Sequence, residues 1–435
     1  MALDPEELKK RRQQRLEQRK LQQARRKSLL IKLGIALGVL VLVGILILVL
    51  VSMGNDTPPA ETVNTPPATG TEVPPETTVS EDTAVVRLAF AGDLNVTEQV
   101  ANAEDYTRLL MDVTPALADA DLTVLNFEGS FFGGSDDPDH AAPQALADAL
   151  ADAGVDMLQI ANSYSIFKGM EGLSATVNTI RAAGMEPLGA YASQKEAKAA
   201  KGYTLREVNG VKLAFVAFTK GMDGMALPPG NESCVNLLYT DYATDYQKVD
   251  KEGITRVIEA AKRERPDVII ALLHWGSEYN NTISKTQTEI LELLQENGVR
   301  AVIGTHSHYV QGMTLDPETN NFVAYSLGDF IPAMDRAGSE YSVVLELEIT
   351  KDLKARKTRI TSFDYTPIFT VAQENRPLQV VRIQPAIDAY SAGYIDRVPE
   401  TTFEAMKYAL GRIKARIHGE SAEPEETTAP AETTE

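Results

Sequence analysis

The sequence predicts an α/β protein with a mixed β-sheet, preceded along the chain by one transmembrane helix. Three observations lead to this prediction. Apolar runs rich in β-branched residues alternate with helix-like stretches at the spacing of α/β folds. Two later segments have the pattern of antiparallel hairpins, which makes the sheet mixed rather than purely parallel. A long apolar run without any charge stands near the N-terminus, before all of these elements.

Composition narrows the class of protein. The chain has 435 residues, of which 43% are hydrophobic, so it can bury a large core and is neither a disordered chain nor a membrane protein with many spans. Its one cysteine, Cys234, excludes a disulfide framework and a zinc site built on cysteines. The formal net charge of -19 argues against nucleic acid as a partner of the main domain, because phosphate binding needs a basic face.

Basic residues are concentrated at the N-terminus. Residues 1–32 hold eleven Lys or Arg against four acidic residues, a net of +7, which leaves -26 for the rest of the chain. Residues 33–53 carry no charge and have about the 20 residues that a helix needs to cross a bilayer. No small-residue cleavage pattern follows this run, so we expect an uncleaved anchor. The basic flank then places residues 1–32 in the cytoplasm and the main domain outside the cell, as a single-pass protein of the cell membrane.

Two stretches of low apolar content flank the part that is expected to fold. Residues 54–83 are rich in Pro, Thr and Glu and are predicted to form a disordered linker. Residues 419–435 repeat this composition and are predicted to form a disordered acidic tail. The extracytoplasmic domain is therefore expected at residues 84–418.

The elements of this domain can be predicted in chain order. Strands are expected where β-rich apolar runs occur, at residues 85–92, 122–128, 155–162, 212–219, 267–275 and 300–308. Helices are expected at residues 142–154, 170–184 and 286–298, each of which ends at Gly or Asn-Gly, a common helix stop. The two predicted hairpins, at residues 313–328 and 342–365, have polar turns between apolar runs.

Polar side chains stand at the ends of the predicted parallel strands. Because ligands bind outside the carboxyl ends of strands in open α/β sheets, we expect these side chains to share one edge. They are Asp93, Asn126, Glu128, Asn162, His274, His306 and His308. Carboxylate, amide and imidazole groups suit a divalent metal such as Mn, Fe or Zn, and two such ions about 3.5 to 4 Å apart can hold both sides of a phosphoryl displacement. A structural role in turns or strand-end hydrogen bonds stays open for each residue.

Seven segments, taken in order, resemble the CapA family of poly-γ-glutamate capsule synthesis proteins, whose domain is related to the calcineurin-like metallophosphoesterases. They are AGDLN (91–95), LNFEG (125–129), the Ala-Asn pair 161–162, TKGMDGMALPP (219–229), HWGSEY (274–279), GTHSHYVQG (304–312) and YSLGDF (325–330). The resemblance covers most of the predicted domain. It implies a metallophosphoesterase-like sandwich of mixed sheets flanked by helices.

The resemblance also implies roles for single residues. The family's metal ligands fall on Asp93, Glu128, Asn162, His274, His306 and His308, which would hold one divalent ion or two. His274 and Glu278 would act in catalysis, with Glu278 orienting substrate groups or accepting from them. The family's usual His is replaced here by Tyr164, and Asp329 stands where the family commonly has Asn. His140 lies in a polar, loop-like stretch and has no partner at ligand spacing, so it is not included in the predicted site.

Two main functions follow from these observations. The first is a membrane-anchored protein that makes, exports or handles an anionic capsule polymer, poly-γ-glutamate by resemblance, with metal-dependent phosphoester hydrolysis if the site is active. The second is a catalytically degenerate scaffold that binds the polymer or a polymer-synthase subunit, which the Tyr164 replacement favours. A hydrolase of unrelated wall or nucleotide phosphoesters is a third. A polyanion would meet this acidic domain through the metals or through a basic patch that includes Lys168 and Lys220.

Overall fold

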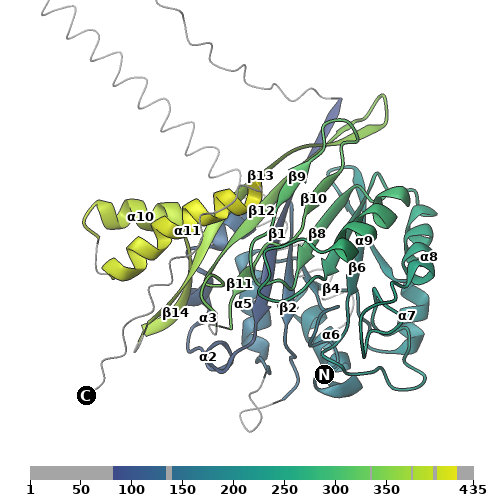
Figure 1. Cartoon of the computed structure of the whole chain (residues 1–435), viewed down its shortest axis with the longest axis horizontal. Helices are drawn as coiled ribbons and strands as arrows, with labels where there is room; N and C mark the ends of the chain where they lie inside the picture. The colour runs from purple at the N-terminus through teal and green to yellow at the C-terminus, as the bar shows by residue number, and fades with distance from the viewer. Residues whose placement is uncertain (1–81, 134–139, 334–335, 374–375, 395–398, 419–435) are drawn as a thin grey trace, which may run out of the picture. The chain divides into compact units, whose positions relative to one another are not determined.

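The structure is a computed structural model that describes residues 82–133, 140–333, 336–373, 376–394 and 399–418 (Figure 1). The predicted anchor at residues 33–53, the acidic tail and nearly all of the predicted linker lie outside these ranges. Among the described residues, no helix has both the length and the apolar character needed to span a membrane. The first described element begins at Thr83 and the last ends at His418.

The first sheet has eight strands in the order β14-β13-β12-β1-β2-β3-β4, with β11 paired to the end of β1. Strands β1, β2, β3 and β4 are mutually parallel, whereas β12, β13 and β14 continue the sheet in antiparallel pairs. The bounds are β1 Thr83–Asn95, β2 Leu122–Glu128, β3 Met157–Gln159, β4 Glu186–Leu188, β11 Asp329–Ile331, β12 Tyr341–Asp352, β13 Lys357–Gln373 and β14 Arg376–Arg382. This sheet is therefore mixed, as the sequence predicted.

The second sheet has six strands in the order β5-β6-β7-β8-β10-β9. Its four central strands are parallel, and the two edge strands, β5 and β9, are antiparallel to their neighbours. The bounds are β5 Tyr203–Val208, β6 Val211–Thr219, β7 Val268–His274, β8 Ala301–Thr305, β9 Met313–Leu315 and β10 Phe322–Ala324. In each sheet the carboxyl ends of several parallel strands therefore lie at the same edge, where polar residues can come together.

The two sheets stack face to face, because alternate residues of each strand point to opposite faces. Leu88 and Phe90 of β1 belong to the same buried cluster as Leu213 and Phe215 of β6, which identifies the core between the sheets. Ala89 and Ala91 of β1 belong instead to a second buried cluster on the outer face. The predicted sandwich of mixed sheets is therefore confirmed.

Helices cover both outer faces of the sandwich (Figure 1). Buried side chains of α3, α4, α5 and α6 join the outer cluster of the first sheet, and those of α8 and α9 join the outer cluster of the second. The bounds are α2 Glu98–Ala101, α3 Tyr106–Leu110, α4 Thr114–Ala118, α5 Gln144–Ala153, α6 Gly169–Ala182, α7 Gln194–Ala200, α8 Lys251–Lys262, α9 Lys285–Glu296, α10 Ile383–Ser391 and α11 Glu400–His418. The result is four layers, with helices outside two sheets.

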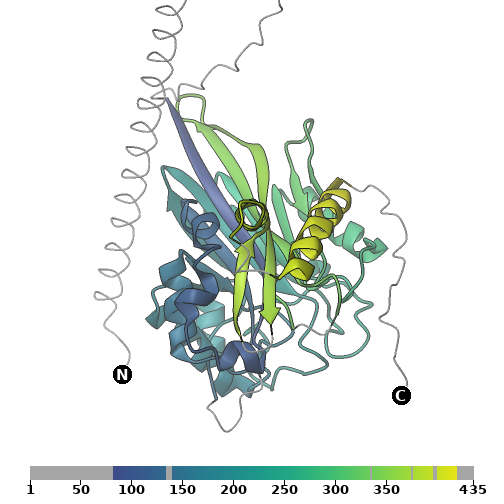
Figure 2. The same cartoon turned by 90° about the vertical axis from the view of Figure 1, so that its left-hand side faces the viewer.

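The C-terminal helix α11 completes the inner core. Met406, Ala409, Ile413 and Ile417 recur at helical spacing and are buried in the cluster between the sheets. In Figure 2 this yellow helix lies beside the light-green strands of the first sheet, and α11 contacts β12 and β13. The helix therefore belongs to the folded domain.

Most predicted elements are present. The three predicted helices correspond to α5, α6 and α9, and the two predicted hairpins to the pairs β9-β10 and β12-β13. The strand predicted at residues 155–162 is shorter, since β3 ends at Gln159 and the polar Asn162 lies in the loop beyond it. The elements that the sequence did not predict are β4, β5, β11, β14, α2, α3, α4, α7, α8, α10 and α11.

Candidate metal centre

The predicted ligands come together at the carboxyl ends of parallel strands from both sheets. Asp93 is near the end of β1, Glu128 ends β2, Asn162 follows β3, His274 ends β7, and His306 and His308 follow β8. All six side chains are buried. The expectation that they share one edge is met because each lies at, or just beyond, the carboxyl end of a buried strand of the same sandwich.

Gly92 allows β11 to approach β1. A Cβ atom at this position would overlap the carbonyl oxygen of Gly328, to which the backbone N–H of Asp93 donates a hydrogen bond of 3.1 Å. The register of the two strands then places Asp329 opposite Asp93. A residue without a Cβ is therefore needed to bring these two carboxylates onto adjacent strands.

Asp93 lies at the centre of the cluster and links the two sheets. Its Oδ1 accepts a hydrogen bond of 2.6 Å from Nδ2 of Asn126, and its Oδ2 accepts one of 2.9 Å from the backbone N–H of His306. Nδ1 of His308 is 3.9 Å from Oδ2. These contacts hold the carboxylate in one orientation between β2 and the loop after β8.

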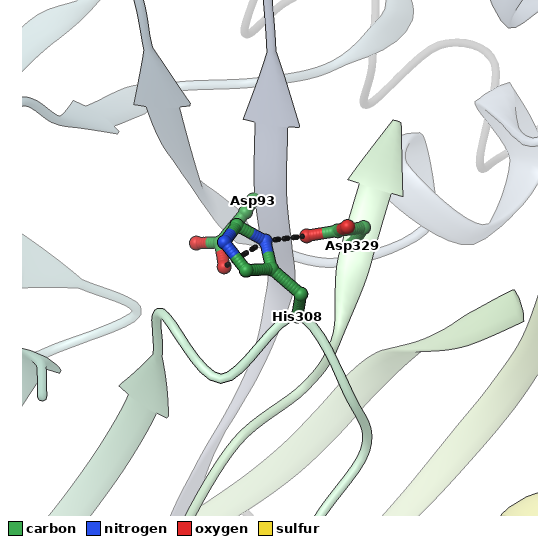
Figure 3. A group of neighbouring side chains, drawn as sticks. All are labelled: Asp93, His308 and Asp329. Atoms are coloured by element: carbon green, nitrogen blue, oxygen red, sulfur yellow. Dashed lines mark hydrogen bonds and ion pairs between the residues drawn. The ribbon is translucent and has the colours of Figure 1, made fainter. Parts of the chain in front are cut away.

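Two groups of three side chains have the geometry of a metal site, and Asp93 belongs to both. One group is Asp93, His308 and Asp329, and the other is Asp93, Glu128 and His274. Within each group the ligand atoms lie within 4.8 Å of one another. Figure 3 shows the first group, in which the ring of His308 lies between the two aspartates. A shared carboxylate between two groups can serve two adjacent cations.

Burial makes the ionised form of the carboxylates in the cluster unfavourable. Burial, and then the neighbouring charge of Asp93, raises the pKa of Glu128 well above its ordinary value. Burial also raises the pKa of Asp329 to about 7, although the positive charge of His308 opposes this shift. A divalent cation would stabilise the ionised form of both groups in place of a proton.

The three imidazoles have different environments. Burial lowers the pKa of His308, but nearby carboxylates, first of all Asp329 at 2.8 Å, outweigh burial and raise this pKa to about 10. Burial, followed by the charge of other cations, lowers the pKa of His274 and His306 well below the ordinary value. His274 and His306 are therefore held as neutral imidazoles, the form that binds metals.

His306 provides a direct test of whether a metal fits. Its side chain is 4% exposed, and within the described part of the chain its Nδ1 atom is buried without a hydrogen-bond partner. Its ring centroid is 4.4 Å from that of His274 and 6.2 Å from that of His308. A buried nitrogen without a partner is costly, and coordination to a cation would satisfy it. His306 also has a φ of 85°, a strained backbone conformation of the kind found at functional sites.

Asn162 has a different environment from the other predicted ligands. Its Nδ2 donates to Oδ1 of Asn126 at 3.1 Å and to the carbonyl oxygen of Phe127 at 2.6 Å. Its Oδ1 accepts a hydrogen bond of 3.0 Å from the backbone N–H of Tyr164. Asn162 thus orders the loop after β3 and holds Asn126 in place, and its role as a ligand stays a prediction.

The two predicted catalytic residues are placed differently. His274 is inside the cluster, where Nδ1 lies 3.1 Å from Oγ1 of Thr305 and Nε2 lies 3.1 Å from Oγ of Ser163. Glu278 is exposed and belongs to neither group of three. Burial lowers the pKa of Lys220, and the negative charge of Glu278 opposes this shift only in part. The catalytic role of Glu278 therefore also stays a prediction.

Two central residues were absent from the predicted ligand set. Asp329 was noted only as a departure from the family pattern, yet it completes one group of three. Asn126 donates to both Asp93 and Glu128 and is 2% exposed. The alternation of Asn126 with Glu128 at the end of a strand was a usable signal, since residues two apart share a face. Asp329 had no comparable signal, because its pairing partner is far away in the sequence.

Together these features define an α/β sandwich protein with a buried carboxylate and imidazole cluster suited to divalent metals. The model of the bacterial capsule synthesis protein PGA_cap family matches residues 87–334, more than half of the chain, and the chain belongs to this family. The match includes every residue of both groups of three. The predicted CapA resemblance is confirmed.

Two curated relatives agree with this assignment. The chain is 24% identical over 304 residues to the PGA biosynthesis protein CapA of Bacillus subtilis (strain 168), which covers 67% of this chain and 73% of that protein. It is also 24% identical over 249 residues to the capsule biosynthesis protein CapA of Bacillus anthracis, covering 54% and 56% of the two chains.

Solved structures show only a distant likeness. A phosphatase from Mycoplasma pneumoniae aligns with 12% identity over 66% of this chain and 94% of its own, with a TM-score of 0.41. The calcineurin-like phosphoesterase YfkN from Bacillus subtilis aligns with 15% identity over 66% of this chain and 90% of the aligned YfkN chain, with a TM-score of 0.38.

Proposed function

We propose that the protein acts in the synthesis, export or handling of an anionic capsule polymer and carries a two-ion, phosphoesterase-type site. The observation that supports this most directly is the pair of ligand groups that share Asp93, in a chain of the capsule synthesis family. Poly-γ-glutamate is the polymer that we propose, because the Bacillus subtilis relative is a PGA biosynthesis protein. The proposed location is the outer face of the cell membrane, with residues 33–53 as the anchor.

The residues of the two groups would hold the metals. Asp93, His308 and Asp329 would hold one ion, and Asp93, Glu128 and His274 the other. Nδ1 of His306, which has no hydrogen-bond partner among the described residues, would be a further ligand. Mn, Fe or Zn suits these donors, and such ions activate water and neutralise the charge of a phosphoryl group.

The surrounding residues orient the ligands. Asn126 donates to both Asp93 and Glu128, and Thr305 contacts Nδ1 of His274. Lys220, whose Nζ donates to the carbonyl oxygen of Gly276 at 2.9 Å, adds positive charge close enough to lower the pKa of His274 and His306. A bound anion would therefore meet metals and a lysine in a chain that is acidic as a whole.

The test is hydrolysis of bis-p-nitrophenyl phosphate by the full-length protein with added manganese, together with metal analysis by mass spectrometry. We expect metal near two ions per chain and turnover, both lost in the His306→Ala, His308→Ala double variant. His418→Ala is the matched control, since His418 is exposed at the end of α11. An absence of metal under all loading conditions would contradict the metal site.

One observation favours a second function, a catalytically degenerate scaffold for the polymer or a synthase subunit. Tyr164 occupies the position that the family resemblance assigns to an imidazole, and a tyrosine hydroxyl with an ordinary pKa near 10 is a poor acid at neutral pH. The Tyr164→His variant separates the two functions. A gain in turnover would indicate a weakened enzyme, whereas metal binding with no turnover in either protein would indicate a scaffold.

A further inference from the structure

His140 is held beside the candidate metal centre by the backbone that follows Glu128. Its carbonyl oxygen accepts a hydrogen bond of 2.7 Å from the N–H of Ser130, which is two residues beyond Glu128. The carbonyl oxygen of Ser130 in turn accepts one of 2.8 Å from Ala142. These bonds form an isolated bridge that fixes the start of the segment leading into α5.

Two backbone features make this position specific. A Cβ atom at Gly129 would lie 3.0 Å from the carbonyl oxygen of His140 and would overlap Val96, so a glycine is needed for the close approach. His140 itself has a φ of 51°, in the left-handed region that non-glycine residues rarely adopt. Such strain persists where the surrounding structure holds a residue in place, and it is concentrated at functional sites.

The imidazole of His140 lies against the loop that follows Asn162. Its ring stacks on Tyr164 with centroids 4.1 Å apart and meets the edge of Phe167 at 5.1 Å. The backbone N–H of Tyr164 donates to Oδ1 of Asn162, and the neighbouring Ser163 contacts Nε2 of His274. His140 therefore bridges two loops, one that follows Glu128 and one that carries Asn162 and Ser163.

We propose that His140 donates an N–H group to an anionic oxygen of a phosphoryl group bound at the centre. This inference rests on the proposed function, because it requires the metal-bound site. An imidazole keeps at least one N–H donor whether it is neutral or protonated, unlike a carboxylate. The imidazoles of His274 and His308 contact carboxylates of the centre, whereas His140 stands outside both ligand groups and can serve the substrate.

The test measures binding of inorganic phosphate to the manganese-loaded, full-length protein by titration calorimetry. His140→Phe keeps a ring that can stack on Tyr164 but removes the donor. Loss of one charge-assisted hydrogen bond should weaken phosphate binding by about tenfold to a hundredfold. Metal content and melting temperature should stay at wild-type values, and His418→Phe, which removes an exposed histidine, should bind phosphate as the wild type does.

A second pair of variants keeps the test decisive if His140→Phe does not fold. His140→Gln retains an N–H donor and His140→Leu does not, so the Gln variant should bind phosphate about tenfold more tightly than the Leu variant. Equal affinity in wild type and the Phe variant, or in the Gln and Leu variants, would overturn the role of His140. Metal-loaded wild type that binds no phosphate would overturn it too while leaving the metal site intact, whereas failure to bind metal would contradict the proposed function itself.

Discussion

Among single residues, Asp93 has the greatest influence on the candidate centre. It belongs to both ligand groups, accepts hydrogen bonds from Asn126 and from the backbone of His306, and is fully buried. Asp329 belongs to one group only. The number of ions that remain bound should therefore depend on which of the two aspartates is substituted.

We expect Asp93→Asn to abolish metal binding, because it removes a charged ligand from both groups. Asp329→Asn should keep roughly half of the metal, since the group of Asp93, Glu128 and His274 remains complete. Metal content of the purified proteins by mass spectrometry measures this. The control is Asp148→Asn, an exposed residue of α5, which should bind metal as the wild type does. Equal loss in the Asp93 and Asp329 variants would contradict a shared ligand.

Metal affinity should fall as the pH decreases from 8 to 6. Burial raises the pKa of both Glu128 and Asp329, and with a pKa of about 7 the Asp329 carboxyl group takes up a proton in this range when no metal is bound. Protonation removes ligands, so each proton displaced by the metal weakens binding by about tenfold per pH unit below the pKa. Manganese titrations at several pH values measure the effect. Affinity that is constant from pH 6 to pH 8 would be inconsistent with these shifts.

At the scale of elements, the close contact of β1 with β11 carries the site. The loop at Gly328 and the start of β11 fit against β1 only because position 92 has no side chain. The C-terminal helix has a different kind of role. Its apolar stripe fills the core between the sheets, although it lies outside the residues matched by the family model.

Two glycine substitutions should have opposite effects on stability. Gly92→Ala should lower the free energy of unfolding by about 1 to 3 kcal/mol, or more, because its Cβ overlaps backbone rather than a movable side chain. Gly411→Ala in α11 meets nothing within 4 Å and should raise it by about 0.5 to 1 kcal/mol through helix propensity. Urea unfolding measures both. Gly92→Ala should also weaken metal binding, and a neutral effect there would contradict the described contact.

At the scale of the whole molecule, charge is distributed very unevenly. The basic N-terminal segment and the apolar run precede an acidic domain whose cations near the candidate centre include Lys220. This distribution fits a protein attached to a membrane by its N-terminus, with an anionic ligand drawn to the metals rather than to the general surface.

The proposed topology gives an expected labelling pattern. Ala60→Cys, beyond the apolar run, should react with a membrane-impermeant maleimide on intact cells, whereas Ala24→Cys in the basic segment should react only after lysis. Native Cys234 is buried, so its background labelling should be low. Removal of residues 1–53 should release the protein from the membrane fraction. Labelling of Ala24→Cys on intact cells would reverse the orientation.

The sequence alone was sufficient for the fold class and for most of the candidate ligands. Strand patterns and the polar residues that end them are local signals, so Asp93, Glu128, His274, His306 and His308 could be selected without a structure. The helices at α5, α6 and α9 carried equally local stop signals. The sequence did not predict α11, because its apolar stripe packs into the core between the sheets, and that core is formed by distant segments.

Only the tertiary structure decided which residues meet. His306 bonds to Asp93 across 213 residues, and Asp329 enters the cluster because β11 pairs with β1. Contacts between separate loops likewise place His140 on Tyr164 and turn the amide of Asn162 toward Asn126, whereas Glu278 is exposed. A sequence pattern reports the face on which a side chain lies, but the partner opposite that face is set by contacts between distant segments.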